Sequence, residues 1–293
     1  SSVLMAAVPA QVAGVKEIVM TSPPAADGSL NPYSLVAASI AGVTEIYKVG
    51  GAQAIAALAY GTESLKPVHK IVGPGNIYVT LAKKLVYGQV DIDMLAGPSE
   101  ILIIADESAQ AEYLAADLLS QAEHDALARA ILLTPSLKLA MEVQQEVEKQ
   151  VNKLSRKNIA QKAIEEGSCA IVVSNLEEAV ALANDFAPEH LELAVQAPFD
   201  ILGKIQNAGS IFLGHYSPEP LGDYFAGPNH VLPTGGTAKF YSPLNVDMYM
   251  KKSGLISYSK KGLFKAGEDI IKLAQVEGLE AHAQAIKVRM EKG

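Results

Sequence analysis

The sequence predicts an α/β protein with two parallel-sheet units, helices on both faces of each sheet, and a small helical tail at the C-terminus. Short runs rich in β-branched residues alternate with longer segments of helical periodicity, which is typical of parallel strands joined by crossover helices. The last segment is polar, rich in lysine and helical in pattern. We therefore expect two Rossmann-like units, at residues 1–100 and 101–246, and a tail at 247–293.

In the first unit, Asn31 precedes Pro32 at the start of a helical segment and is expected to cap that helix. Gly50 and Gly51 turn one strand into a helix, and the sequence Gly-Pro-Gly before Asn76 does the same further on. The predicted strands cover residues 17–20, 44–49 and 70–72, and the predicted helices cover residues 32–42, 52–60 and 76–87.

The second unit begins at a strand and carries one strongly amphipathic helix, in which Ala111, Leu114, Leu118 and Ala122 share a face. The predicted strands cover residues 101–105, 130–133, 170–173, 193–195 and 210–213, and the predicted helices cover residues 108–124, 137–154, 159–166 and 177–185. Residues 214–242 are rich in Gly and Pro and too long for a plain connector, so we expect a functional loop there. The tail has too little apolar surface to fold alone, and a partner subunit is one surface that it could cover.

Composition narrows the classes of protein. The chain has 293 residues, of which 49% are hydrophobic and 19% charged, and 24 basic against 32 acidic residues give a net charge of −8. This apolar content predicts a globular core and excludes disorder. The chain lacks the basic excess that nucleic-acid binders use, and its apolar stretches are shorter than the roughly 20 residues of a membrane span. We expect neither a nucleic-acid nor a membrane partner.

The single cysteine, Cys169, permits no intrachain disulfide, so a reducing compartment, the cytoplasm, is expected. The chain begins with Ser1 rather than Met, and no charged segment precedes its first apolar run, so the pattern is not that of a signal peptide. The N-terminus resembles the middle of a helix. We expect the chain to be a fragment or a processed product of a longer one.

Two pairs of residues suggest chemistry. Gln121 and His124 lie three apart on one helix face, where they could bind a metal or form an ordinary solvated helix end. Glu189 and His190 are adjacent, and such a pair suits proton transfer, although an ordinary helix-to-strand turn is the alternative. Asp223 in the irregular loop is a possible third metal ligand.

A nucleotide or substrate site is suggested more weakly, because the sequence has neither Gly-x-Gly-x-x-Gly nor a Walker loop. The turn before Asn76 could offer backbone N–H groups to a phosphate or a ribose, or be only a tight turn. Gln53 follows the carboxyl end of a predicted parallel strand, where ligands bind in open sheets. Ser99 is either a substrate-contacting hydroxyl or a turn residue.

Longer blocks of sequence carry a more specific signal. These blocks are IDMLAGPSEI at 92–101, DLLSQAEH at 117–124, VGGAQA at 49–54, GPGN at 73–76, APEHL at 187–191, GPNHVLPT at 227–234 and EGL-x-AH at 277–282. In this order they resemble the histidinol dehydrogenase family over the whole chain, and the most specific match runs from 92 to 101 and continues to 117–124.

The resemblance implies an enzyme of histidine biosynthesis that oxidises L-histidinol to L-histidine through the aldehyde L-histidinal, using two NAD and one zinc per site. By similarity, the zinc ligands are Gln121, His124, Asp223 and His282. The resemblance also implies a homodimer in which each C-terminal tail lends its His282 to the other subunit.

The same resemblance assigns the remaining positions. Glu189 and His190 resemble the acid–base pair of the family. Gln53 and Asn76 resemble positions that contact NAD. The substrate-binding positions implied are Ser99, Gln121, His124, His190, Asp223, Glu277 and His282.

The chain departs from the family pattern at its front, since family members carry further residues upstream, including a Tyr-x-Pro-Gly-Gly block that helps to hold the nucleotide. Two alternatives therefore stay open. One is a truncated, catalytically impaired dimer that binds metal, and the other is a related zinc- and NAD-dependent dehydrogenase that acts on another alcohol.

Overall fold

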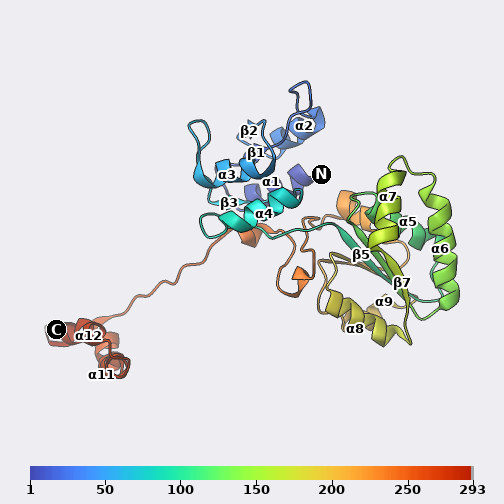
Figure 1. Ribbon diagram of the computed structural model, residues 1–293. Helices are drawn as coiled ribbons and strands as arrows, with labels where there is room; N and C mark the ends of the chain where they lie inside the picture. The colour runs from blue at the N-terminus through green and yellow to red at the C-terminus, as the bar shows by residue number, and fades with distance from the viewer. Residues whose placement is uncertain (292–293) are drawn as a thin grey trace. The chain divides into compact units, whose positions relative to one another are not determined.

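The computed structural model describes residues 1–291 and divides the chain into two compact units, Ser1–Met250 and Lys251–Gly293 (Figure 1). The first part of the larger unit alternates short strands with helices. Its elements are α1 (Ser2–Val12), β1 (Val19–Thr21), α2 (Pro32–Ile40), β2 (Glu45–Tyr47), α3 (Gly51–Tyr60), β3 (Lys70–Ile71), α4 (Ile77–Val86) and β4 (Asp91–Ile92).

The strands of this part form two parallel pairs, β1 with β2 and β3 with β4. Helix α2 begins as the sequence predicts, because the Asn31 Oδ1 accepts the backbone N–H of Tyr33 at 2.9 Å. Asn76 caps α4 in the same way, accepting the N–H groups of Tyr78 and Val79. The short strand β4 has no counterpart among the predicted elements.

The second part of the larger unit is built around one parallel sheet. Its elements are β5 (Glu100–Ala105), α5 (Ala111–Ala122), β6 (Arg129–Thr134), α6 (Leu137–Val151), α7 (Lys157–Gly167), β7 (Cys169–Val172), α8 (Leu176–Phe186), β8 (His190–Ala194), α9 (Pro198–Leu202), β9 (Ser210–Leu213), α10 (Glu219–Leu221), the π-helix η1 (Gly222–Ala226) and the 3₁₀ helices η2 (Thr237–Lys239) and η3 (Val246–Tyr249).

The strand order in this sheet is β7-β6-β5-β8-β9, and every pairing is parallel. Counted from β5, this is the order 3-2-1-4-5 of a Rossmann-type sheet, with β5 in the centre. The α/β class predicted from alternating strand and helix patterns is confirmed.

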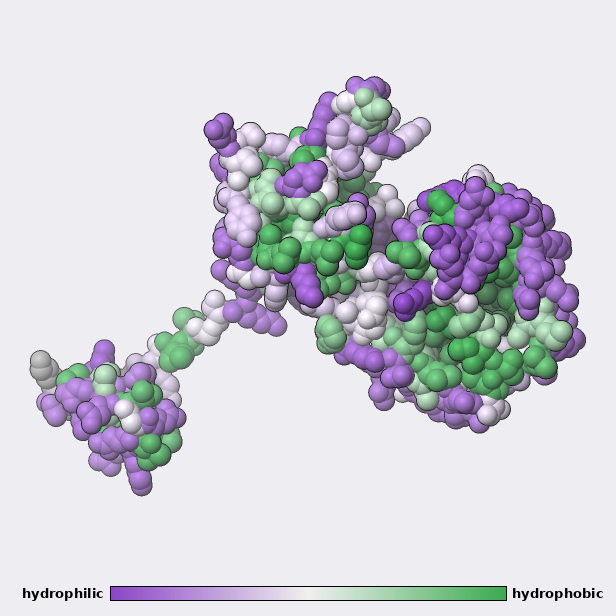
Figure 2. Space-filling model, viewed as in Figure 1, coloured by the Kyte–Doolittle hydropathy of each residue, from purple (hydrophilic) through white to green (hydrophobic). Residues whose placement is uncertain are grey.

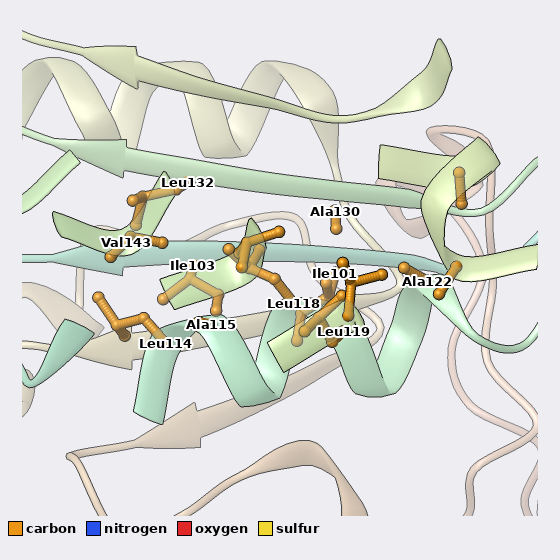
Figure 3. Packing of buried hydrophobic residues seen from close by; sticks show 14 of the residues in the cluster. Ile101, Ile103, Leu114, Ala115, Leu118, Leu119, Ala122, Ala130, Leu132 and Val143 are labelled. Atoms are coloured by element: carbon orange, nitrogen blue, oxygen red, sulfur yellow. The ribbon is translucent and has the colours of Figure 1, made fainter. Parts of the chain in front are cut away.

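Helices cover both faces of the five-stranded sheet, because successive side chains of a strand point to opposite faces. Ile101 and Ile103 pack with α5, α6 and α7, as Figure 3 shows for their contacts around Leu114 and Leu118. Leu102 and other alternate residues pack under α8 and α9 instead. All six residues of β5 are buried. This core fixes the edge of the sheet at which the polar residues described below gather.

Strand β8 begins at His190, whereas the sequence pattern placed its start at Leu193. The difference arises because His190 and Glu192 are polar, and polar residues at a strand start resemble a turn. The alternation along β8 places Leu191 and Leu193 in the core beneath α8. His190 and Glu192 therefore face the α5 side of the sheet.

The smaller unit holds two helices, α11 (Lys260–Val276) and α12 (Glu280–Glu291), joined at Gly278, whose φ of 72° lies in the left-handed region. They pack closely, since a Cβ on Gly267 would come within 2.3 Å of the Met290 sulfur. Among the residues described, no helix combines the length and apolar character needed to cross a bilayer.

Candidate catalytic and metal-binding site

Polar side chains gather at the amino edge of the five-stranded sheet. Glu100 starts β5 and His190 starts β8, and the two strands are parallel neighbours in which Ile101 pairs with His190. Helix α5 crosses back from the carboxyl end of β5 to the start of β6, so its penultimate residue Gln121 returns to the same edge. Ligands of open α/β sheets usually bind at the carboxyl edge, and this cluster lies at the opposite one.

Backbone atoms of Glu100 hold the Glu189–His190 pair in place. The Glu189 Oε2 accepts the backbone N–H of Glu100 at 2.8 Å, and the His190 Nδ1 lies 2.9 Å from the carbonyl oxygen of Glu100. A carbonyl oxygen can only accept, so Nδ1 of a neutral His190 donates the hydrogen bond and Nε2 keeps its lone pair. The ring is thereby fixed as a base that accepts a proton at Nε2.

Burial shifts the proton affinities of this pair in opposite directions. It lowers the pKa of His190 to about 4, against the opposing effect of the hydrogen bond to Glu100. It raises the pKa of Glu189 well above its usual value, and the nearby charges of Glu100, Glu219 and Asp223 raise it further against the effect of the Glu100 N–H. At neutral pH the imidazole is uncharged and can act as a general base.

Several side chains with possible metal-ligand atoms lie at this edge of the sheet. One ligand atom from each of His190, Glu219 and Asp223 lies within 4.8 Å of the other two. The Gln121 side chain is 1% exposed, and its Oε1 has no hydrogen-bond partner among the described residues. The His230 Nδ1 is also buried without a hydrogen bond, 3.5 Å from the Asp223 Oδ2. Asp223 itself is carried by the π-helix η1, a feature often found at functional sites.

These groups fit a divalent cation. An unpartnered buried amide oxygen is costly unless something positive lies next to it. Burial raises the pKa of Asp223, but the close approach and charge of His230 outweigh this effect and hold that pKa below its usual value. An anionic carboxylate, an amide oxygen and imidazole nitrogens form a donor set that zinc accepts.

A row of buried carboxyl groups supports η1 from the sheet. The Glu192 Oε1 accepts the backbone N–H of Glu219 at 2.8 Å, at the start of the segment that leads to Asp223. Burial raises the pKa of Glu219 to about 8, with a contribution from the charge of Asp223. Burial also raises the pKa of Asp117 to about 6, although its hydrogen bond with Glu192 acts in the other direction.

This row makes the stability of the metal-free protein depend on pH. The pKa of Glu219 is higher in the folded protein than in the unfolded chain, so folding favours its protonated form. Its contribution to the free energy of unfolding is therefore greatest below about pH 4.5 and is lost as the pH rises through 8. We expect Glu219→Gln to stabilise the metal-free protein at pH 8 by about 1–3 kcal/mol and to change little at pH 4.5. Urea denaturation at both pH values measures this, and a gain of the same size at both would contradict it.

The other predicted site residues lie in separate places. His124 is exposed just beyond α5, near enough for its charge to influence His190. Ser99 directly precedes β5, and its carbonyl oxygen accepts the N–H of Arg129 at 3.0 Å. Gln53 is exposed in the first turn of α3, and Asn76 is exposed at the start of α4.

Glu277 and His282 are exposed residues of the smaller unit. Glu277 follows the last residue of α11, and His282 lies in the first turn of α12. The positions of these two residues are described only within their own unit.

Sequence reasoning overlooked Glu100, Glu192 and Glu219. One signal was available for Glu192, because a charged residue inside an otherwise apolar strand requires a buried partner. No comparable signal marks Glu219, whose role depends on the proximity of η1 to β8. Its proximity arises from the tertiary fold.

The fold and the cluster together are typical of an α/β enzyme, with a buried Glu–His pair next to a group of side chains that could hold a metal ion. Comparison with known proteins identifies the family. The family model described as histidinol dehydrogenase matches residues 1–290. The chain belongs to the histidinol dehydrogenase family, whose members are NAD-dependent oxidoreductases of histidine biosynthesis.

Individual relatives agree with this assignment. The histidinol dehydrogenase of Heliobacterium mobile is 63% identical over 292 residues, covering 100% of this chain and 68% of the relative. That of Geobacillus kaustophilus is 60% identical over 293 residues, covering 100% and 69%. The crystal structure of histidinol dehydrogenase from Elizabethkingia anophelis superposes with a TM-score of 0.94 at 45% identity, covering 99% of this chain and 67% of that one.

Proposed function

We propose that the protein oxidises L-histidinol to L-histidine through L-histidinal at the amino edge of the five-stranded sheet. The observation that carries this proposal is a neutral buried imidazole, His190, with a ring nitrogen within 4.8 Å of a carboxylate oxygen of Asp223, at the edge of the sheet to which α5 returns the unpartnered oxygen of Gln121. This arrangement offers one base for the alcohol and one region that can bind a cation and orient the substrate.

We assign the zinc ligands to Gln121, His124, Asp223 and His282 of the partner subunit. We assign His190 to proton transfer rather than to the metal, because with Glu189 it resembles the acid–base pair of the family. The Glu100 carbonyl engages its Nδ1 and leaves Nε2 free to accept a proton. Bound zinc would hold the nitrogen atoms of the substrate, and NAD would supply the hydride acceptor.

The residues of this chain then have distinct roles in the two oxidations. His190 accepts the hydroxyl proton of the alcohol at Nε2 while the adjacent carbon loses its hydride. Glu189 accepts a proton from the water that adds to the aldehyde, and because burial raises its pKa, its carboxylate is a stronger base than an exposed one. His190 returns its proton to the aldehyde oxygen, which completes the hydrate and frees Nε2. The hydrate then loses the second hydride of the reaction, with His190 again accepting the hydroxyl proton. Ser99 of this chain would contact the substrate, and so would Glu277 of the partner subunit.

We assign Gln53 and Asn76 to the nucleotide. Both follow the carboxyl ends of short parallel strands. Gln53 lies in the first turn of α3 and Asn76 directly precedes α4, at helix starts where backbone N–H groups are free. Since the Asn76 Oδ1 caps α4, its Nδ2 amide group is the part left to donate to a ribose or a phosphate oxygen.

We also propose a homodimer that exchanges its C-terminal tails. The smaller unit carries Glu277 and His282, and its described residues form two helices. Apolar side chains remain exposed on these helices and on the segment of the unit that precedes α11. Figure 2 shows apolar residues in green on that segment, where Leu255 is 96% and Ile256 88% exposed. A second copy of the chain would cover such surface. Cys169, an exposed free thiol, fits a cytoplasmic protein.

The proposal is tested by mixing the zinc-loaded protein with L-histidinol and NAD and following NADH by absorbance. We expect two NADH for each histidinol, L-histidine as the product, and loss of the signal after zinc is chelated. Zinc bound without any NADH would indicate a metal-binding dimer without turnover. NADH formed only with another alcohol would indicate a related dehydrogenase.

A further inference from the structure

A buried ion pair lies in the part of the larger unit that holds α4. Lys83 projects from α4 and pairs with Asp93, which follows β4, and their side chains are only 3% and 0% exposed. The neighbouring pair between Lys70 and Asp91 is much more exposed, at 19% and 52%. Burying two charges is costly, so a buried pair is retained only where its further hydrogen bonds satisfy both groups.

Those further bonds converge on one residue, Gly73, in the turn between β3 and α4. The Asp93 Oδ2 accepts the Gly73 N–H at 2.7 Å, and the Lys83 Nζ donates to the Gly73 carbonyl oxygen at 3.0 Å. Both backbone polar groups of Gly73 are thus held by the same ion pair. Its φ of 107° is a conformation that other residues rarely adopt, so the turn is held in one specific shape.

The same turn leads directly to Asn76. From there, the Thr80 Oγ1 donates to the carbonyl oxygen of Ala96 at 2.7 Å, which ties α4 to the segment that precedes Ser99. Replacing the ion pair by apolar side chains of similar size would fill the space but would leave the Gly73 N–H and C=O without partners. The buried charges of Lys83 and Asp93 are therefore explained by the hydrogen bonds that they make to the turn at Gly73.

We propose that Lys83 and Asp93 are positioning residues for nucleotide binding, which keep residues 73–76 in the shape that receives NAD. This inference rests on the proposed function, because Asn76 is assigned to the nucleotide there. Both side chains are too buried to reach a dinucleotide, so they act through the backbone of Gly73. Their effect should appear in NAD affinity and leave the zinc and histidinol sites unchanged.

The test compares Lys83→Met with Lys70→Met, which removes the more exposed neighbouring pair that joins β3 to β4. Titration calorimetry on the zinc-loaded protein gives the Kd for NAD, and steady-state kinetics gives the KM for histidinol. We expect Lys83→Met to raise the Kd for NAD at least tenfold, with zinc affinity and the KM for histidinol within twofold of the unsubstituted protein. Lys70→Met should change all three by less than twofold.

Because Lys83→Met leaves the Asp93 charge buried alone, a second variant, Lys83→Met with Asp93→Asn, removes both charges and should show the same loss of NAD affinity. A Kd for NAD within twofold in the folded double variant would overturn the inference, as would an equal loss of zinc affinity. If neither variant folds, the pair is required for folding and the inference is also wrong. Failure of the unsubstituted protein to bind NAD would instead contradict the proposed function.

Discussion

Replacing His190 with asparagine is expected to lower kcat for histidinol oxidation by about 10²–10⁴-fold, the range of a lost general base. Asparagine can still donate a hydrogen bond to the Glu100 carbonyl, so the start of β8 should remain in place. It offers no basic nitrogen where Nε2 lies. We expect zinc affinity to change by less than about tenfold, because His190 is assigned to proton transfer and not to the metal. Metal titration and steady-state kinetics on the same sample measure both effects.

This variant separates two interpretations of the donor cluster. The geometry also permits a metal held by His190, Glu219 and Asp223. If His190 were a ligand, its replacement would remove the metal and the activity together. The matched control is His215→Asn. His215 lies within hydrogen-bond distance of the Ser108 hydroxyl, and Ser108 follows the carboxyl end of β5, at the opposite edge of the sheet. That control should leave kcat and zinc affinity unchanged.

Replacing His282 with alanine is expected to weaken zinc binding by at least about 100-fold, more than the loss of a residue that only supports a ligand. Activity should fall with it. Co-expressing His282→Ala chains with His190→Asn chains should restore activity to about a quarter of the unsubstituted level. Random pairing makes half of the dimers mixed, and one site in each mixed dimer has both residues intact.

This recovery depends on exchange of the tails. If each site used the His282 of its own chain, both sites of a mixed dimer would be defective and the mixture would stay inactive. His69→Ala is the control, since His69 is an exposed residue of the larger unit outside the donor cluster. It should bind zinc and turn over normally, and its failure to do so would mean that the loss is not specific to His282.

Much of the fold could be predicted because it follows from local rules. Periodicity located β5 and α5 to within a few residues, since one buried strand and one amphipathic face are encoded in consecutive residues. The cap at Asn31 was predicted for the same reason, and a helix was expected to start at Asn76. The start of β8 was placed too late, because His190 and Glu192 are polar and only long-range partners make them compatible with a strand.

The candidate site likewise has a part that the sequence could predict and a part that depends on the fold. The sequence, through its family resemblance, named Gln121, Asp223 and the Glu189–His190 pair as functional residues. Which nitrogen of His190 is free depends on the Glu100 carbonyl, which is 90 residues away in the chain. No periodicity in the sequence can encode that contact, because adjacent strands of a parallel sheet are joined only through crossovers.

The order of strands and helices, the family and the identities of the candidate ligands were therefore determined by the sequence alone. Only the tertiary structure showed that the cluster lies at the amino edge of the sheet, that Gln121 Oε1 is left without a partner, and that Lys83 and Asp93 hold Gly73. The physical reason is that hydrogen-bond satisfaction is a property of neighbours in space. Burial determines which polar groups require a partner, and the packed fold determines which of them find one.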